Sequence, residues 1–119
     1  MSPLDVQLIA TSLREFASDR DWNKFHTPKN LATSIVVEAA ELLELYQWSV
    51  GSTGWKELED AKLRQKTADE LADILIYLIR FSDLSGIDLA TAVQQKIEIN
   101  NAKYPAEKFR GSDRKYTEG

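Results

Sequence analysis

Two acidic pairs of equal spacing are the residues of this chain best suited to chemistry. Glu38 and Glu41 form the first pair, and Glu70 and Asp73 form the second. At roughly 100° per residue, two residues with this spacing lie on the same side of a helix. The chain has no cysteine, and clustered carboxylates without cysteine or histidine favour hard divalent cations. The pairs therefore predict one shared metal site for Mg²⁺, or alternatively Mn²⁺.

Each acidic pair interrupts an otherwise apolar helical face. Around Glu38 this face carries Leu31, Ile35, Leu42 and Leu45, and around Glu70 it carries Leu63, Thr67, Ile74, Tyr77 and Phe81. An isolated ionised carboxylate is costly to bury unless it is paired or binds a metal. Solvated carboxylates would explain one pair, but two pairs centred in apolar faces favour the metal site. A di-iron bundle requires Glu-x-x-His pairs, and neither pair is followed by histidine.

A helical face with basic residues is the second group of candidate binding residues. Lys96, Asn100 and Lys103 are spaced to share one side of a helix. Lysine stems often run along half-exposed surface, which is the alternative for each lysine alone. Beside a metal site, however, the two lysines could neutralise the other side of a polyphosphate. The net charge of −4 argues against bulk electrostatic binding to nucleic acid.

Large aromatic residues could add a stacking surface to such a phosphate site. Trp22, Phe25, Trp48 and Tyr77 are residue types that more often serve in packing, but flat side chains near phosphates also suit a nucleobase. His26 is the only histidine. We expect it to be a hydrogen-bonded structural or ligand-positioning group, because no nucleophile for it to activate is apparent.

Helical periodicity and capping residues predict four helices that would position these groups. The predicted segments are 2–19, 27–48, 67–84 and 88–103, with an aromatic loop before the second, a short helical lead-in before the third and an extended tail over 106–119. Ser2-Pro3 and Thr27-Pro28 each combine a capping hydroxyl with proline at the first helical position. Strand-like alternation is absent. We therefore expect an all-α, four-helix bundle-like fold in a single domain, 1–119.

Length and composition narrow the classes of protein further. The chain of 119 residues suits one domain, and no apolar run reaches the ~18 residues that indicate a membrane span. The N-terminal residues lack the basic region of a secretory signal, so we expect a cytoplasmic protein. Polar residues spread over the helical faces leave little dry core, so burial against a second subunit is also expected.

The chain resembles the all-α, MazG-like nucleoside triphosphate pyrophosphatases, and within them the dCTP pyrophosphatase branch. The resemblance extends from Phe16 to Thr117 and includes both acidic pairs. The matching features are the loop 20–30, the segments 38–48 and 73–78, Lys96, Asn100, Lys103-Tyr104-Pro105, Arg110-Gly111-Ser112 and Lys115-Tyr116.

This resemblance implies Mg²⁺-dependent hydrolysis between the α- and β-phosphates of a nucleotide, which yields the monophosphate and pyrophosphate. The expected substrate is dCTP or a modified dCTP, and the expected role is cleansing of the nucleotide pool. It implies that Glu38, Glu41, Glu70 and Asp73 bind the metal. One of the glutamates would orient the attacking water. Glu41 is preferred over Glu38 because it flanks the apolar face instead of centring it.

The resemblance also implies a binding pocket and an assembly. Trp22, His26, Trp48, Tyr77 and Asn100 would line the base and sugar pocket, and Lys96, Lys103, Tyr104, Lys115 and Tyr116 would contact the phosphates. The family forms homodimers or dimers of dimers, so Lys115 and Tyr116 could come from a neighbouring subunit. The alternative is a non-catalytic nucleotide-binding or helical interaction module, which would need no complete set of four acids.

Overall fold

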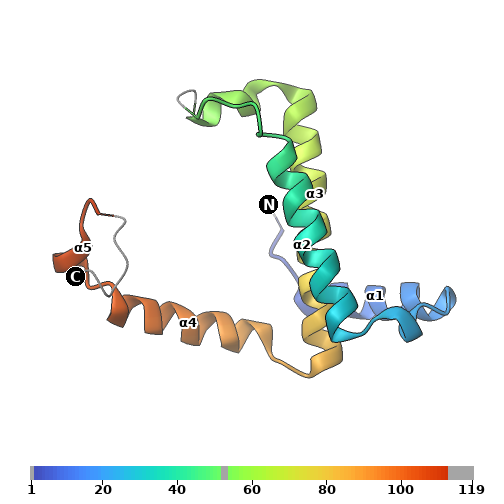
Figure 1. Cartoon of the computed structure of the whole chain (residues 1–119). Coiled ribbons are helices and arrows are strands. Elements are labelled where there is room, and N and C mark those ends of the chain that lie inside the picture. The colour runs from blue at the N-terminus through green and yellow to red at the C-terminus, as the bar shows by residue number, and fades with distance from the viewer. Residues whose placement is uncertain (1, 52–53, 113–119) are drawn as a thin grey trace. The chain divides into compact units, whose positions relative to one another are not determined.

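The protein is all-α in the computed structural model, which describes residues 2–51 and 54–112. The elements are α1 (Val6–Asp19), η1 (Asn23–Phe25), α2 (Pro28–Glu44), η2 (Gly54–Glu59), α3 (Ala61–Ser85), α4 (Leu89–Lys103) and α5 (Ala106–Phe109), where η denotes a 3₁₀ helix (Figure 1). No strand occurs in these ranges, so the predicted fold class is confirmed. Over the same ranges, no helix combines the length and apolar character that crossing a bilayer requires.

The chain divides into two compact units, Met1–Ser85 and Gly86–Gly119. The first unit contains α1, α2 and α3, and therefore both acidic pairs. The second contains α4 and α5, and therefore the predicted basic face. Each unit is described by itself below, and the expectation of a single domain stays a prediction.

An antiparallel hairpin of α2 and α3 forms the centre of the first unit, and α1 packs against α3 (Figure 1). The two apolar faces predicted from the sequence turn inward: Leu31 is buried and the other members are half-buried. A hydrogen bond of 2.5 Å joins the hydroxyls of Tyr46 and Thr67. Because Thr67 donates its own proton to the Leu63 carbonyl, Tyr46 is the donor. This bond sets the end of α2 against the start of α3.

The C-terminus of α1 places Trp22. The N–H of Asp21 donates to the Ser18 carbonyl over 3.1 Å, and the N–H of Trp22 donates to the Ala17 carbonyl over 2.9 Å. These two bonds make a Schellman motif, which requires a left-handed residue, and Asp21 has φ 54°. The Trp22 ring then packs edge to face on Phe16, with ring centroids 5.5 Å apart. The helix end thereby fixes the position of this aromatic side chain.

Helix boundaries follow the strongest local cap. The Thr27 side chain accepts a hydrogen bond from the N–H of Asn30, as predicted for α2. The predicted start at Ser2 is wrong: Asp5 accepts from the N–H of Leu8 and α1 begins after it, because aspartate caps as well as serine and lies next to the first half-buried residue, Val6.

Two other boundaries also differ from those predicted. Helix α3 begins at Ala61, six residues before the predicted start, because Asp60 accepts from the N–H of Lys62 over 2.9 Å. The predicted lead-in is confirmed as η2. Helix α2 ends at Glu44, and the chain continues in tight turns with bonds between residues three apart, from Leu45 to Leu42 and from Tyr46 to Leu43.

In the second unit, the Asp88 side chain caps α4 through the N–H of Thr91, and α4 ends before Tyr104 as predicted. The prediction that residues from 106 onward are extended is wrong, because α5 forms there. Its Phe109 is buried and packs edge to face on Tyr104, with centroids 5.1 Å apart. Burying Phe109 against Tyr104 stabilises the short helical turn.

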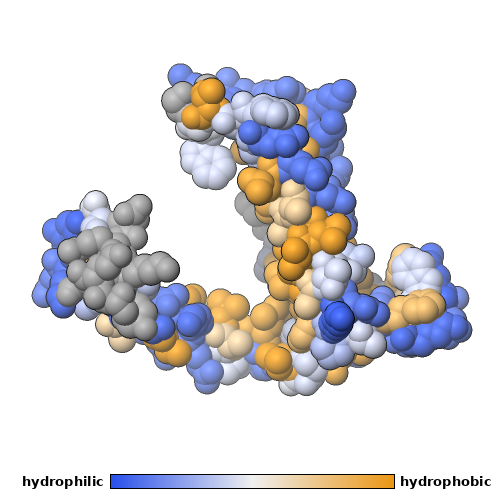
Figure 2. All heavy atoms as spheres, in the orientation of Figure 1, coloured by the Kyte–Doolittle hydropathy of each residue, from blue (hydrophilic) through white to orange (hydrophobic). Residues whose placement is uncertain are grey.

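Apolar side chains remain exposed on the outer faces of the hairpin. On α2, Val36 is 67% exposed and Leu43 is 69% exposed, and Leu71 of α3 is exposed as well. Apolar atoms follow α2 along the visible side of the hairpin (Figure 2). An exposed apolar surface of this kind is typical of a face that binds another protein surface.

Substitution of Asp21 tests the backbone that fixes Trp22. We expect Asp21→Val to lower the free energy of unfolding by about 1–2 kcal/mol, because a β-branched residue is strained in the left-handed conformation. Asp21→Gly should lose little, since glycine adopts this conformation freely and the exposed Asp21–Lys24 ion pair contributes little. Urea unfolding followed by circular dichroism measures both. Equal stability of the Val and Gly variants would contradict the prediction, and Lys24→Ala is the control for the ion pair.

Candidate functional site

Three of the four predicted acids converge across the α2–α3 hairpin. Glu38, Glu41 and Glu70 each offer one carboxylate oxygen, and these oxygens lie within 4.8 Å of one another. The convergence follows from the antiparallel packing of two helices, each with its acids in the inward face. The fourth acid, Asp73, is not part of this group of oxygens but is close enough to raise the pKa of both Glu38 and Glu70 by charge repulsion.

The acidic group carries uncompensated electrostatic strain. The pKa of Glu38 is raised to about 7, first by burial and then by hydrogen bonding with Glu70 and Glu41 and by repulsion from Glu41 and Asp73. Burial is the largest cause of a raised pKa of Glu70; hydrogen bonding with Glu38 lowers this pKa, and Glu41 and Asp73 raise it. The Oε2 atoms of Glu38 and Glu70 are buried without a hydrogen-bond partner among the described residues.

A divalent cation would fit this donor set. Buried carboxylate oxygens without donors nearby are stabilised by a bound cation, and an all-oxygen, all-carboxylate set suits hard ions such as Mg²⁺ or Mn²⁺. The two unpartnered Oε2 atoms are the observation that carries this reading, since hydrogen bonds would otherwise satisfy them. Glu38, Glu41 and Glu70 could bind the ion directly, and Asp73 contributes negative charge beside them.

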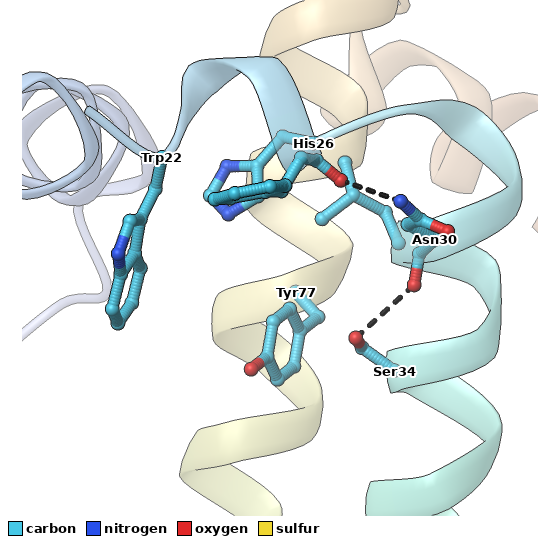
Figure 3. Close-up of a pocket in the computed structure, with 7 residues that line it drawn as sticks. Trp22, His26, Asn30, Ser34 and Tyr77 are labelled. Carbon is cyan, nitrogen blue, oxygen red and sulfur yellow. Dashed lines mark hydrogen bonds between the residues drawn. The ribbon is translucent and has the colours of Figure 1, made fainter. Parts of the chain in front are cut away.

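A pocket of about 260 Å³ lies at the other end of the hairpin from η2, where η1 and the start of α2 meet α3. It is lined by Trp22, Phe25, His26, Asn30, Leu31, Ser34 and Tyr77. In Figure 3, His26 lies between Trp22 and Asn30, and Tyr77 lies below it. The amide of Asn30 donates to the Phe25 carbonyl over 2.9 Å, which fastens η1 to α2. Three flat side chains and several polar groups thus share one small cavity.

The pocket and the acidic group lie on the same two helices, one turn apart. Ser34 of the pocket precedes Glu38 by four residues, and Asp73 precedes Tyr77 of the pocket by four residues. Four residues of α-helix rise by roughly 6 Å. A ligand whose flat part occupies the pocket can therefore reach the carboxylates with its next group.

A buried arginine supports the pocket from α3. Arg80 donates from Nε to Nδ1 of His26 over 3.0 Å and from Nη2 to the Asn23 side-chain oxygen over 2.6 Å. Asp83 lies 3.9 Å from Arg80 Nη1 and accepts two hydrogen bonds from Arg14 at 2.6 and 2.7 Å. Burial and the neighbouring Arg80 charge lower the pKa of His26. The pocket histidine is therefore kept neutral.

The other predicted binding residues do not join these two sites within the first unit. Trp48 is 88% exposed at the far end of the hairpin. Lys96, Asn100, Lys103 and Tyr104 belong to the second unit. Lys115 and Tyr116 lie outside the described residues. Their assignment to the base or the phosphates stays a prediction.

Sequence reasoning missed several groups that line the pocket or support it. Asn30 and Ser34 lie on the N-terminal turns of α2 beside Leu31, and Asn23 lies in η1; short polar residues of this kind are too common to indicate a site. Arg80 was detectable in part. It follows Tyr77 by one helical turn, so a charged residue borders the inward face of α3, as the acids do.

The pH dependence of stability tests the strain at Glu38. Because its folded pKa of about 7 exceeds the ordinary 4.5, the folded state holds an extra proton between these values. Stability must therefore fall as the pH rises through this window. In metal-free protein we expect the melting temperature to fall between about pH 4.5 and 7.5, with a shallower fall in Glu38→Gln. Thermal unfolding in a chelator measures this.

Two controls isolate the effect of Glu38. The lowered pKa of His26 contributes a rise in stability with pH in the range below its ordinary 6.5, so the difference between wild type and Glu38→Gln is the informative quantity. Glu44→Gln, which removes an exposed carboxylate of the same helix, should keep the full fall. Mg²⁺ should raise the melting temperature above about pH 7. If wild type and Glu38→Gln had parallel profiles, the strain assigned to Glu38 would be absent.

Known proteins resemble this chain in sequence over most of its length. Human dCTP pyrophosphatase 1 is 45% identical over 108 residues, which cover 87% of this chain and 61% of the human protein. The cattle dCTP pyrophosphatase 1 is 43% identical, over 87% of this chain and 62% of its own. This chain thus spans less than two thirds of these relatives' length.

A solved structure and a family model extend the comparison. The crystal structure of a pyrophosphatase from Archaeoglobus fulgidus matches with a TM-score of 0.79 and 42% identity, over 88% of this chain and 96% of that one. The model of the MazG-like family matches residues 33–118, a range that includes all four predicted acids. The chain belongs to the MazG-like family.

Proposed function

We propose that this protein hydrolyses a nucleoside triphosphate between its α- and β-phosphates and releases the monophosphate and pyrophosphate. The observation that carries the proposal is the group of three carboxylates, with two unpartnered oxygens, one helical turn from an aromatic pocket. The names of the relatives, dCTP pyrophosphatase 1 and pyrophosphatase, support this chemistry. The first name also favours dCTP as substrate. The proposal includes a modified dCTP as the alternative substrate and cleansing of the nucleotide pool as the role.

The acids and the pocket have separate tasks in this proposal. Glu38, Glu41, Glu70 and Asp73 would hold Mg²⁺, which when bound offsets the phosphate charge and polarises the α-phosphate. Glu41 orients a water for attack on the α-phosphorus and takes its proton. The bond from the α-phosphorus to the bridging oxygen breaks, and pyrophosphate leaves. Positioning and charge neutralisation supply most of the rate enhancement.

The pocket would bind the base. Trp22 and Tyr77 supply flat surfaces for stacking, and His26, Asn30 and Ser34 supply polar groups at its edge. A base bound there leaves its sugar and α-phosphate on the side of the acids, one turn along both helices. As the family resemblance implies, Trp48 and Asn100 would complete the base and sugar contacts. The groups that would contact the phosphates are Lys96, Lys103, Tyr104, Lys115 and Tyr116.

Assembly into a homodimer or homotetramer would serve two needs. The exposed apolar side chains of α2 and α3 lose contact with water when a second subunit covers them. Trp48 does not reach the pocket of its own subunit. A second subunit could supply its Trp48, or its Lys115 and Tyr116, to that pocket. Oligomerisation therefore stabilises the hairpin and completes the site in the same step.

The acid substitutions Glu41→Gln and Glu70→Gln test the reaction. Each removes a negative charge without changing the shape of the side chain, so we expect kcat to fall by at least about a hundredfold while the helical circular dichroism spectrum stays unchanged. Release of monophosphate from a panel of canonical and base-modified deoxynucleotides, with and without Mg²⁺, measures turnover and base preference. Near-normal Mg²⁺-dependent activity in either variant would refute the site.

The same assay separates the enzyme from a binding module. A binding module would bind nucleotides, seen as quenching of tryptophan fluorescence, without forming a monophosphate at any Mg²⁺ concentration. Glu44→Gln, the exposed carboxylate of the same helix, is the matched control and should keep wild-type turnover.

A further inference from the structure

Arg80 is the one buried charged side chain among the described residues, and the catalytic scheme above does not use it. Its relative exposure is 3%, and its side chain bonds to His26 and Asn23 at the back of the pocket. Taking a guanidinium out of water is costly unless its donors are satisfied. A group that carries this cost beside a binding pocket is a candidate for a functional role.

The chemistry of the Arg80–His26 bond determines the state of the histidine. A guanidinium has only donors, so the imidazole nitrogen that faces it must carry a lone pair. That nitrogen is Nδ1, and a neutral imidazole therefore holds its proton on Nε2. Protonating Nδ1 would set two N–H groups against each other beside a positive charge.

We propose that Arg80 is a positioning residue that holds His26 as a neutral Nε2–H donor at the base pocket. The proposal rests on the proposed function and deepens it. It implies that the base presents a hydrogen-bond acceptor, a ring nitrogen or a carbonyl oxygen, to Nε2 of His26. His26 lines the pocket, whereas Arg80 does not, and among the described residues no protein group is hydrogen-bonded to Nε2 of His26.

Two further contacts hold Arg80 in place. Asn23 of η1 accepts from Nη2, and Asp83, one turn along α3, lies near Nη1 while it pairs with Arg14 of α1. Arg80 is the charged group that acts on His26, Asp83 and Arg14 follow behind Arg80, and Tyr77 is a titratable residue of the same pocket. A rigid donor behind the imidazole restricts it to one orientation and one tautomer. The imidazole is therefore already ordered before the base binds, and binding costs less conformational entropy.

The only histidine of the chain makes the test direct. Long-range ¹H–¹⁵N spectra of the full protein report which ring nitrogen carries the proton. We expect the Nε2–H form in the wild type at about pH 7. Finding the proton on Nδ1, or on both nitrogens, would overturn the proposal before any variant is made.

Variants at Arg80 then test the cause. Arg80→Gln places an amide there that both donates and accepts, so it cannot select a tautomer, and a mixture of the two forms is expected. Arg80→Lys keeps a group that only donates and should restore the Nε2–H form. Arg14→Gln breaks the outer ion pair without contacting His26 and should leave the tautomer unchanged. An unmixed Nε2–H signal in Arg80→Gln would contradict the role of Arg80.

Kinetics with dCTP separate positioning from a general structural effect. We expect Arg80→Gln to raise KM by about five- to tenfold, the value of one hydrogen bond, with little change in kcat. In a His26→Gln background the side chain at position 26 is an amide, which has no tautomers and needs no neighbour to keep it a donor. Arg80→Gln should therefore raise KM less there than in the protein with His26. An equal rise in both backgrounds would overturn the proposal.

The spectra are recorded without turnover, so the two proposals can fail separately. A protein that hydrolyses no nucleotide but keeps the Nε2–H form would refute the proposed function. Titration with dCMP would then decide the binding role: a shift of the His26 Nε2 signal is expected, and an unchanged signal would overturn it.

Discussion

The cost of burying carboxylates in an apolar seam is the constraint on which the rest of this structure depends. The α2–α3 hairpin gains stability by burying its inward faces, but Glu38 and Glu70 lie in the middle of those faces. Two of their oxygens have no hydrogen-bond partner within the described part of the chain. A sequence selected for stability alone would place leucine there. The fold therefore keeps a local destabilisation that a cation can relieve, and functional sites commonly store energy in this way.

The base pocket depends on a second constraint: the aromatic side chains of the short segment between α1 and α2 must be held in fixed positions. Loops are mobile unless local structure fixes them. Here the left-handed Asp21 ends α1 and sets Trp22, the Asn30 side chain ties η1 to α2, and Arg80 ties η1 and His26 to α3. Three neighbouring elements thereby hold the loop, so the pocket has a defined shape before a ligand arrives.

The same hairpin leaves apolar side chains such as Val36 and Leu43 in contact with water. The first unit has few fully buried apolar residues, because its inward faces are occupied in part by acids and by Thr67. A small domain that devotes core positions to chemistry has less area left to bury. Covering the outer faces with another subunit would bury additional apolar area and so compensate for the small core. The oligomeric state is in this way linked to the composition of the site.

The sequence by itself determined the all-α fold and the inward position of each acidic pair, because helical periodicity places residues three and four apart on one face. The antiparallel packing of α2 on α3, which brings Glu38, Glu41 and Glu70 together, came from the tertiary structure. The sequence also indicated Trp22, His26 and Tyr77 as residues that line the base pocket, through the resemblance of the chain to a known family. Helix starts such as Asp5 and Asp60 were decided by competition between nearby caps, which local patterns rank poorly. Only the tertiary structure decided that Arg80 faces His26, since residues 54 positions apart meet through packing that no local spacing encodes.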